Sequence, residues 1–249
     1  MRTPLMAGNW KMFKTAVETA AFFEKFIPLV QNQTGRDVVI CPPFLNIPTA
    51  VESTKGSAVR IGGQNSFWMP EGAYTGEISG PMLRAAGAEY VLVGHSERRQ
   101  YFAETDETVL KRTIAALAAG LKPIVCIGEC LEDRESGATE RVCDMQFQGG
   151  IAELTPEQMG GIVIAYEPVW AIGTGKTATP QIAEDAHRFI RSLIASKYGA
   201  GAASATRILY GGSVKLDNAA VLMGQEDIDG VLVGGASLDP VVFGGIVNY

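Results

Sequence analysis

The sequence has no run of basic residues and no long apolar run. Its 21 lysines and arginines are outnumbered by 27 aspartates and glutamates, which gives a formal net charge of −6 at pH 7. This balance argues against a surface that binds nucleic acid or anionic membranes. No apolar stretch approaches the roughly 20 residues that a membrane-spanning helix needs. We therefore expect a protein that binds neither nucleic acid nor membrane.

Signals for export and for disulfide bonds are also missing. The first residues, MRTPLMAGNWKMF, contain no long apolar segment followed by small residues, so we expect no signal peptide. The four cysteines form no CxxC pair; they are Cys41, Cys126, Cys130 and Cys143. Without an export signal we expect reduced thiols, and the cytoplasm is the expected compartment.

Eight short apolar runs are typical of buried parallel strands, and segments with helical periodicity separate them. The predicted strands are Leu5–Lys11, Asp37–Cys41, Val59–Gln64, Tyr90–Gly94, Pro123–Gly128, Ile162–Tyr166, Arg207–Gly211 and Gly230–Gly234. No linker, charge block or low-complexity tract interrupts the 249 residues. Eight strand–helix units in this length predict an α/β fold, a single (β/α)₈ TIM barrel domain over residues 1–249. The alternative is an open doubly wound sheet, which usually has fewer strands.

Three segments carry the signals of amphipathic helices. A capping box at residues 15–18 precedes an apolar stripe made by Phe22, Phe26 and Leu29. Thr179 and Pro180 have the pattern of an N-cap and a first helical residue, and Gly199 can end that helix. A third stripe, closed by a glycine, consists of Leu110, Ile114 and Leu117.

The stretch Ala165–Thr177, AYEPVWAIGTGKT, joins the end of the sixth predicted strand to a long loop. Glu167 follows the strand directly. Residues 173–175 give the loop hinge freedom and bare backbone amides, while Trp170 and Ile172 are too apolar for an ordinary solvated loop. The segment is either a packed surface loop or a lid that closes over a bound molecule.

Polar residues stand where several predicted strands end, which is where barrels place their reactive groups. Asn9 and Lys11 end the first predicted strand. His95 follows the fourth strand and Glu167 follows the sixth. The barrel therefore predicts that these four side chains gather at one mouth.

The histidines and the lysine also have structural interpretations. His95 precedes Ser96 and Glu97, which can begin a short helix whose N-terminal dipole disfavours a charged imidazole, but it could equally be a packed core residue. His187 lies within a predicted helix, and we interpret it as structural. Neither histidine has a partner at metal-ligand spacing, so no metal site is predicted. Lys11 could be a surface lysine with its ammonium in solvent.

Paired glycines follow the last two predicted strands. Gly211 and Gly212 precede Ser213, and Gly234 precedes Gly235. Glycines allow backbone amides to approach an anion, and barrels commonly place a phosphate at this position. One pair alone could be a plain turn, but two pairs at neighbouring strands favour a phosphate site.

Two nucleotide-binding patterns are rejected. The segment 175–177, GKT, resembles the end of a P-loop, but Trp170 stands where the first glycine of that loop is required. Residues 173–178 imitate a dinucleotide fingerprint, but they lie several residues after their strand and end before the helix begins.

Five motifs together resemble the triosephosphate isomerase family. They are AGNWKM at 7–12, GHSERR at 94–99, AYEPVWAIGTGK at 165–176, YGGSVK at 210–215 and VGGASL at 233–238. The resemblance runs from end to end of the chain, in the family's order and spacing. It implies an aldose–ketose isomerase of glycolysis and gluconeogenesis, which interconverts dihydroxyacetone phosphate and D-glyceraldehyde 3-phosphate.

The resemblance also implies roles for individual residues. Glu167 would be the base that moves a proton between two carbons, and a neutral His95 would polarise the carbonyl oxygens, a pairing known from this family. Lys11 and Asn9 would stabilise the enediolate and hold substrate, and Glu97 would pair with or orient Lys11. The phosphate would be held by Gly173, Ser213, Gly234 and Gly235.

The expected partners follow from the same resemblance. No redox or one-carbon chemistry is needed, so no cofactor is expected. The family forms homodimers, in which the Gly72–Glu77 loop enters the neighbouring subunit and Thr75 approaches that subunit's active site. In this sequence the loop could instead cover its own barrel.

Two other functions are considered. A non-catalytic phosphometabolite-binding barrel would keep only the anion site and would have no need for Glu167, His95 and Lys11 together. An aldolase-like enzyme would use Lys11 to form a Schiff base with its substrate.

Overall fold

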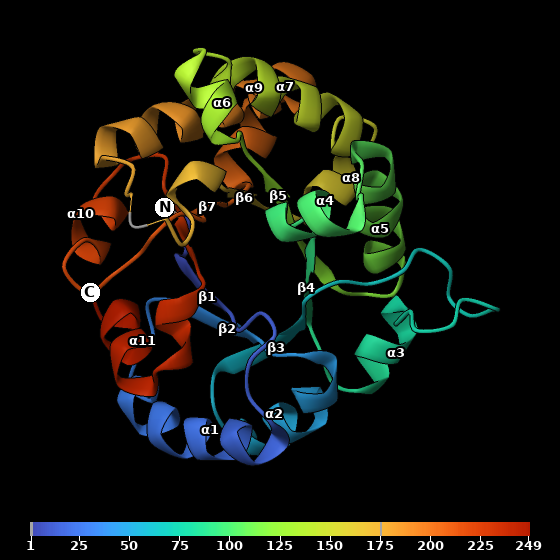
Figure 1. The fold of residues 1–249 in the computed structure, drawn as a ribbon, viewed down its shortest axis with the longest axis vertical. Helices are drawn as coiled ribbons and strands as arrows, with labels where there is room; N and C mark the ends of the chain where they lie inside the picture. Colours follow the sequence, from blue (N-terminus) through green and yellow to red (C-terminus); the bar gives the residue numbers. More distant parts are fainter. Residues whose placement is uncertain (1, 175) are drawn as a thin grey trace.

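A computed structural model describes residues 2–174 and 176–249; Gly175, part of the predicted hinge, lies outside the described residues. Eight parallel strands close into a barrel in sequence order, and helices surround it (Figure 1). The strands are β1 (Leu5–Asn9), β2 (Asp37–Cys41), β3 (Val59–Gly63), β4 (Tyr90–Val93), β5 (Lys122–Ile127), β6 (Val163–Tyr166), β7 (Ile208–Tyr210) and β8 (Gly230–Val233). The predicted (β/α)₈ barrel is confirmed.

The outer layer begins with α1 (Ala16–Val30), and a capping box at Thr15 starts this helix as predicted. The other helices are α2 (Ile47–Ser53), α3 (Gly80–Ala85), α4 (Ser96–Phe102), α5 (Asp106–Ala118), α6 (Leu131–Glu135), α7 (Thr139–Gly150), α8 (Pro156–Met159), α9 (Pro180–Ala205), α10 (Ala219–Met223) and α11 (Pro240–Val247). Short 3₁₀ turns form η1 (Phe44–Asn46), η2 (Val169–Ala171) and η3 (Gly235–Leu238). Within the described residues, every helix is too short or too polar to cross a membrane.

The barrel interior is filled by alternate residues of the strands. This inner core consists of Leu5, Ala7, Val39, Cys41, Tyr90, Leu92, Ile124, Cys126, Val163, Ala165, Leu209 and Leu232. Intervening residues such as Ile164 and Tyr166 belong to the larger core between the strands and the helices. Because side chains alternate along a strand, the next inward position after Ala165 is Glu167. The same alternation in β1 directs Asn9 into the mouth.

Two of the predicted apolar stripes differ from the buried faces. Leu29 of α1 is 42% exposed. In α5 the buried residues are Val109, Arg112, Thr113 and Ala116, whereas Ile114 of the predicted stripe is 38% exposed. Arg112 lies on this buried face, where its guanidinium donates to the Ser66 carbonyl at 2.6 Å. At Gly199, with φ of +87°, α9 is interrupted, and the helix continues to Ala205.

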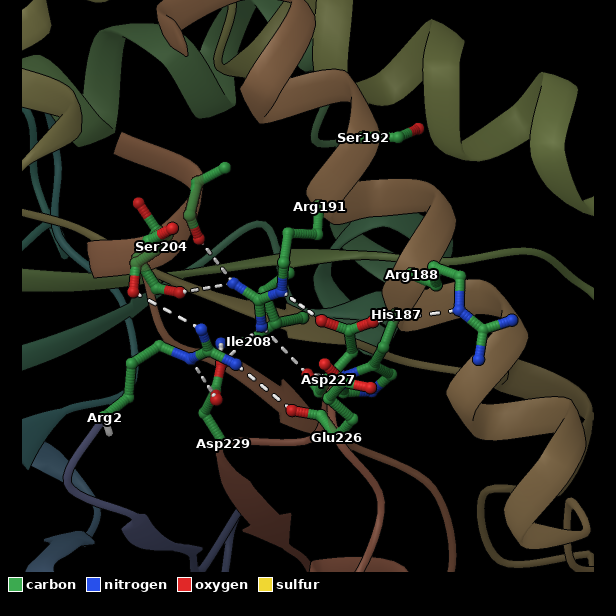
Figure 2. A network of polar contacts seen from close by, with 12 residues as sticks. Arg2, His187, Arg188, Arg191, Ser192, Ser204, Ile208, Glu226, Asp227 and Asp229 are labelled. Carbon is green, nitrogen blue, oxygen red and sulfur yellow. Dashed lines mark hydrogen bonds and ion pairs between the residues drawn. The ribbon is translucent and has the colours of Figure 1, made fainter. Parts of the chain in front are cut away.

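A charged network lies at the amino-terminal ends of β1, β7 and β8, opposite the strands' carboxyl ends (Figure 2). Arg191 of α9 contacts Asp227 at 2.5 Å and Asp229 at 2.6 Å, both in the chain that leads into β8. Asp229 also pairs with Arg2 and accepts the backbone N–H of Ile208 at 2.8 Å. Because these carboxylates are largely buried and fully paired, the network fixes α9 against β7 and β8.

Candidate active site

One cavity of about 280 Å³ at the carboxyl ends of the strands collects most of the predicted site residues. Its lining includes Asn9, Lys11, His95, Glu167, Gly173, Ser213, Gly234 and Gly235. Glu97 lies outside this lining and, with Lys11, faces a neighbouring cavity of about 190 Å³. The barrel therefore brings together residues that are scattered over more than 200 positions of the sequence.

Glu167 is buried immediately after β6, with 2% of its surface exposed. Its backbone N–H donates to the Ile127 carbonyl at 2.8 Å, which continues the ladder between β5 and β6. Its carboxylate accepts the backbone N–H of Ser96 at 2.9 Å and lies 2.9 Å from Nε2 of His95. A side chain at position 211 would come within 2.9 Å of the Glu167 Cγ, so Gly211 leaves room for the carboxylate arm.

These contacts decide the protonation state of the carboxylate. Burial alone would raise the pKa of Glu167, but the electrostatic interaction with His95 and the hydrogen bond from its ring lower it. The Ser96 N–H and the Lys11 ammonium act in the same direction, and the net pKa lies below its ordinary value. Glu167 is therefore an ionised carboxylate at neutral pH although it is buried.

His95 caps the short helix α4, which begins at the residue that follows it, as the sequence predicts. Its Nδ1 accepts the backbone N–H of Glu97 at 3.2 Å. A backbone amide can only donate, so Nδ1 is unprotonated and Nε2 carries the proton of the neutral ring. Burial lowers the pKa of His95, whereas the adjacent Glu167 raises it, and the net pKa lies above its ordinary value in this substrate-free arrangement.

Lys11 lies just beyond β1 rather than at its end, because the chain turns after Asn9. Its backbone adopts φ of +52°, a left-handed conformation that is uncommon for residues other than glycine. Two side chains hold that turn: Asn9 accepts the Lys11 N–H at 3.0 Å, and Gln64 donates to the Lys11 carbonyl at 2.8 Å. The ammonium contacts Glu97 at 2.5 Å. Strained residues of this kind persist where the surroundings fix them, often at active sites.

The stretch that follows β6 is attached firmly at its start and reaches the cavity further on. The indole Nε1 of Trp170 donates to the carboxylate of Glu129 at 2.8 Å, and the Tyr166 hydroxyl donates to the same carboxylate at 3.0 Å. Ile172 and Gly173 then line the cavity. The apolar side chain of Ile172 therefore faces the space that a substrate would occupy.

Several supporting residues were not singled out from the sequence. Glu129 and Gln64 each stand just after a strand, which is a signal that could have identified them. Ser96 contributes its backbone N–H to the Glu167 carboxylate, and a backbone donor cannot be recognised from the type of residue.

His187 lies outside the cavity and is completely buried. Its Nδ1 is 3.2 Å from the carbonyl oxygen of Asp227, and Tyr166 packs edge-on against its ring. Burial lowers the pKa of His187 to about 3. In the described part of the chain, no group of three or more His, Cys, Asp or Glu side chains forms an arrangement that could hold a metal ion.

Comparisons with known proteins agree with the motifs and the fold. A family model described as triosephosphate isomerase matches residues 4–249. A triosephosphate isomerase of Solibacter usitatus (strain Ellin6076) is 66% identical over 249 residues and covers 100% of both chains. One of Citrifermentans bemidjiense is 52% identical and covers 100% of this chain and 99% of the relative.

A solved structure is similar over nearly the whole length. The crystal structure of triosephosphate isomerase from Bartonella henselae matches with a TM-score of 0.89 at 37% identity, over 99% of this chain and 98% of that one. The family resemblance of the sequence is thus confirmed by sequence relatives and by fold. The chain belongs to the triosephosphate isomerase family.

Proposed function

We propose that this cavity interconverts dihydroxyacetone phosphate and D-glyceraldehyde 3-phosphate by proton transfer through an enediolate, with Glu167 as the base. The observation that supports this assignment best is the contact between an ionised, buried carboxylate and the Nε2–H of a neutral imidazole. Glycine amides and the Lys11 ammonium line the same cavity. The reaction belongs to glycolysis and gluconeogenesis.

The proton is carried by Glu167. Isomerisation removes a proton from the carbon beside a carbonyl and returns it to the neighbouring carbon. Without substrate, the carboxylate is held by the Ser96 N–H and by His95. Substrate binding would turn the carboxylate from these two donors toward the carbons, which strengthens it as a base. A positioned base contributes roughly a hundredfold to ten-thousandfold to such a reaction.

The negative charge that forms on the oxygens is met by donors already in place. His95 presents its Nε2–H, and a proton on Nδ1 would displace the Glu97 N–H, so the ring acts as a neutral donor. Lys11 supplies positive charge, and Asn9, which is 5% exposed, supplies a further polar group. One preorganised donor of this kind contributes on the order of 3 kcal/mol.

We place the phosphate at the glycine-rich side of the cavity. Ser213, Gly234 and Gly235 follow the last two strands, and Gly173 reaches the same lining from the loop after β6. Backbone amides supply the local positive potential that an anion needs in a protein with a net charge of −6. The Glu97 carboxylate holds the Lys11 ammonium at 2.5 Å and would orient it toward the substrate.

We further propose a cytoplasmic homodimer of single-domain subunits. The loop that contains Gly72–Glu77 extends away from the barrel and is exposed (Figure 1). Large apolar side chains are also exposed after β1 and in η1, where Met12 is 93% and Leu45 is 91% exposed. The cavity of about 190 Å³ beside Lys11 offers a place for Thr75 of a second subunit.

The two rival functions fit the site less well. A non-catalytic phosphate-binding barrel has no use for a buried base paired with an imidazole. A Schiff-base enzyme needs a neutral amine, whereas the Lys11 ammonium pairs with a carboxylate at 2.5 Å. Neither rival therefore accounts for the full set of contacts around Glu167, His95 and Lys11.

Incubation of the purified protein with dihydroxyacetone phosphate in deuterated water containing EDTA tests the proposal. We expect D-glyceraldehyde 3-phosphate that carries deuterium at the carbon that receives the proton. Binding of dihydroxyacetone phosphate without turnover would contradict the proposal and support the non-catalytic barrel. Inactivation by borohydride only in the presence of substrate would instead support the Schiff-base enzyme.

A further inference from the structure

The hydrogen-bonded pairing between β4 and β5 ends before β5 itself ends. The two strands pair as far as Val93 and Val125, after which the chain leaves β4 to enter α4. β5 continues to Ile127, whose carbonyl faces β6 and accepts the Glu167 N–H. Because backbone groups alternate in direction along a strand, the carbonyl of Cys126 and both polar groups of Gly128 face the side that β4 has left.

Two side chains replace the missing strand. Arg99 donates to the Cys126 carbonyl at 3.2 Å and to the Gly94 carbonyl at 2.8 Å, so it bridges the gap between the strands. Gln146 of α7 bonds to both groups of Gly128: its Oε1 accepts the N–H at 2.7 Å, and its Nε2 donates to the carbonyl at 3.1 Å. The side-chain amide of Gln146 thus makes the two hydrogen bonds that one residue of a neighbouring strand would make. Gln146 is 8% exposed.

Gly128 lies directly against the backbone of the base. A side-chain carbon added at this position would overlap the Glu167 carbonyl oxygen and would come within 3.1 Å of the Glu167 Cα. No residue with a side chain fits there unless one of the two backbones moves. The Glu167 backbone is therefore bounded on the β5 side by the peptide that Gln146 holds.

We propose that Gln146 is a positioning residue for Glu167, which acts by fixing the Gly128 peptide against the backbone of the base. The inference rests on the proposed role of Glu167 as the base. Gln146 lies outside the lining of the candidate cavity, so its effect on Glu167 passes through two hydrogen bonds and one close backbone contact. A displacement of about 1 Å in a catalytic group can reduce the rate on the order of a hundredfold. Apart from Gly173, the phosphate side of the cavity is built from the segments that follow β7 and β8, so we expect substrate binding to be largely unaffected.

The substitution Gln146→Met tests this role, because methionine has a similar length and forms neither hydrogen bond. Tyr198→Phe is the matched control. The Tyr198 hydroxyl donates to the carbonyls of Ile151 and Leu154 at 2.8 and 3.1 Å, and it lies outside the cavity lining. Tyr198→Phe loses one O–H donor that two carbonyls share, and Gln146→Met loses two hydrogen bonds to backbone groups, so both variants are expected to have a lower Tm. Only Gln146→Met is expected to lower kcat per folded subunit, by roughly 10- to 100-fold, with KM within about threefold.

The outcomes separate positioning from a merely structural role. If Gln146→Met keeps kcat within about twofold of the parent, as Tyr198→Phe does, the positioning role is wrong. If Gln146→Met does not fold, Gln146→Glu takes its place, because it keeps the bond from the Gly128 N–H and loses the donor to the Gly128 carbonyl; the same thresholds apply. Glu167→Gln is measured alongside. A Glu167→Gln variant that is still active would overturn the proposed function. If Glu167→Gln is inactive and the Gln146 variant is fully active, only the positioning role is overturned.

Discussion

His187 is predicted to make the stability of the fold depend on pH. Its ring is completely buried, and Nδ1 is 3.2 Å from the Asp227 carbonyl, so the neutral ring donates there. Burial lowers the pKa from an ordinary value of 6.5 to about 3. Between these two values the unfolded chain binds a proton on this residue and the folded protein does not. Acid therefore favours unfolding, and the free energy of unfolding falls as the pH falls below 6.5.

The size of the effect follows from the same two pKa values. Well below 6.5 and above 3, this one residue lowers the free energy of unfolding by about 1.4 kcal/mol for each pH unit. Near its ordinary pKa the slope is smaller. Summed from about pH 7 to about pH 5, the loss is about 2 kcal/mol.

Urea unfolding of the parent and of His187→Asn over this pH range measures the effect. Asparagine can still donate a hydrogen bond to the Asp227 carbonyl, but it does not titrate. His187→Asn loses packing at every pH, and all other titrating groups are common to both proteins. The informative quantity is therefore how the difference in the free energy of unfolding between the two proteins changes with pH. We expect the stability advantage of the parent to shrink by about 2 kcal/mol from about pH 7 to about pH 5. A difference that stays constant with pH would refute the argument that the buried imidazole is neutral.

Two further predictions concern the cavity. Shortening the Val169–Lys176 loop with Glu167 in place should reduce isomerisation steeply and raise the fraction of turnovers that release phosphate and methylglyoxal. An enediolate phosphate expels its phosphate group unless its carbon–oxygen bond is held in the carbonyl plane, and the closed loop would hold it there. The ratio of the two products is the quantity to measure, and an unchanged ratio would show that the loop only binds substrate. Activity should persist in EDTA, while sulfate and inorganic phosphate should compete with substrate in steady-state kinetics; a rise in kcat/KM on adding a divalent ion would contradict this.

The barrel could be predicted because its signals are local. Each strand is a short apolar run bounded by glycine or polar residues, and the start of α1 is encoded within four residues as a capping box. The positions of Asn9 and Glu167 followed from the rule that reactive groups stand at the strands' carboxyl ends. These features depend on sequence neighbours alone.

What could not be predicted depends on contacts between distant segments. The buried face of α5 includes Arg112, whose guanidinium bonds to a carbonyl 46 positions away. The left-handed backbone of Lys11 depends on Gln64, 53 positions later. The bond from the Ser96 N–H to Glu167 and the two bonds between Gln146 and Gly128 exist only once the strands are in register. A single sequence read for local patterns contains no signal for such pairs.

The central claim, that Glu167 carries the proton, is tested most directly by kcat of Glu167→Gln in a coupled isomerase assay. Glutamine has the same shape and can still accept the Ser96 N–H through its amide oxygen, so the fold should be retained, which circular dichroism checks. Because an amide cannot take up the proton, we expect kcat to fall by at least about a thousandfold. Glu167→Asp, which keeps a carboxylate one methylene further back, should retain more activity. A folded Glu167→Gln variant with near-parental kcat would contradict the account.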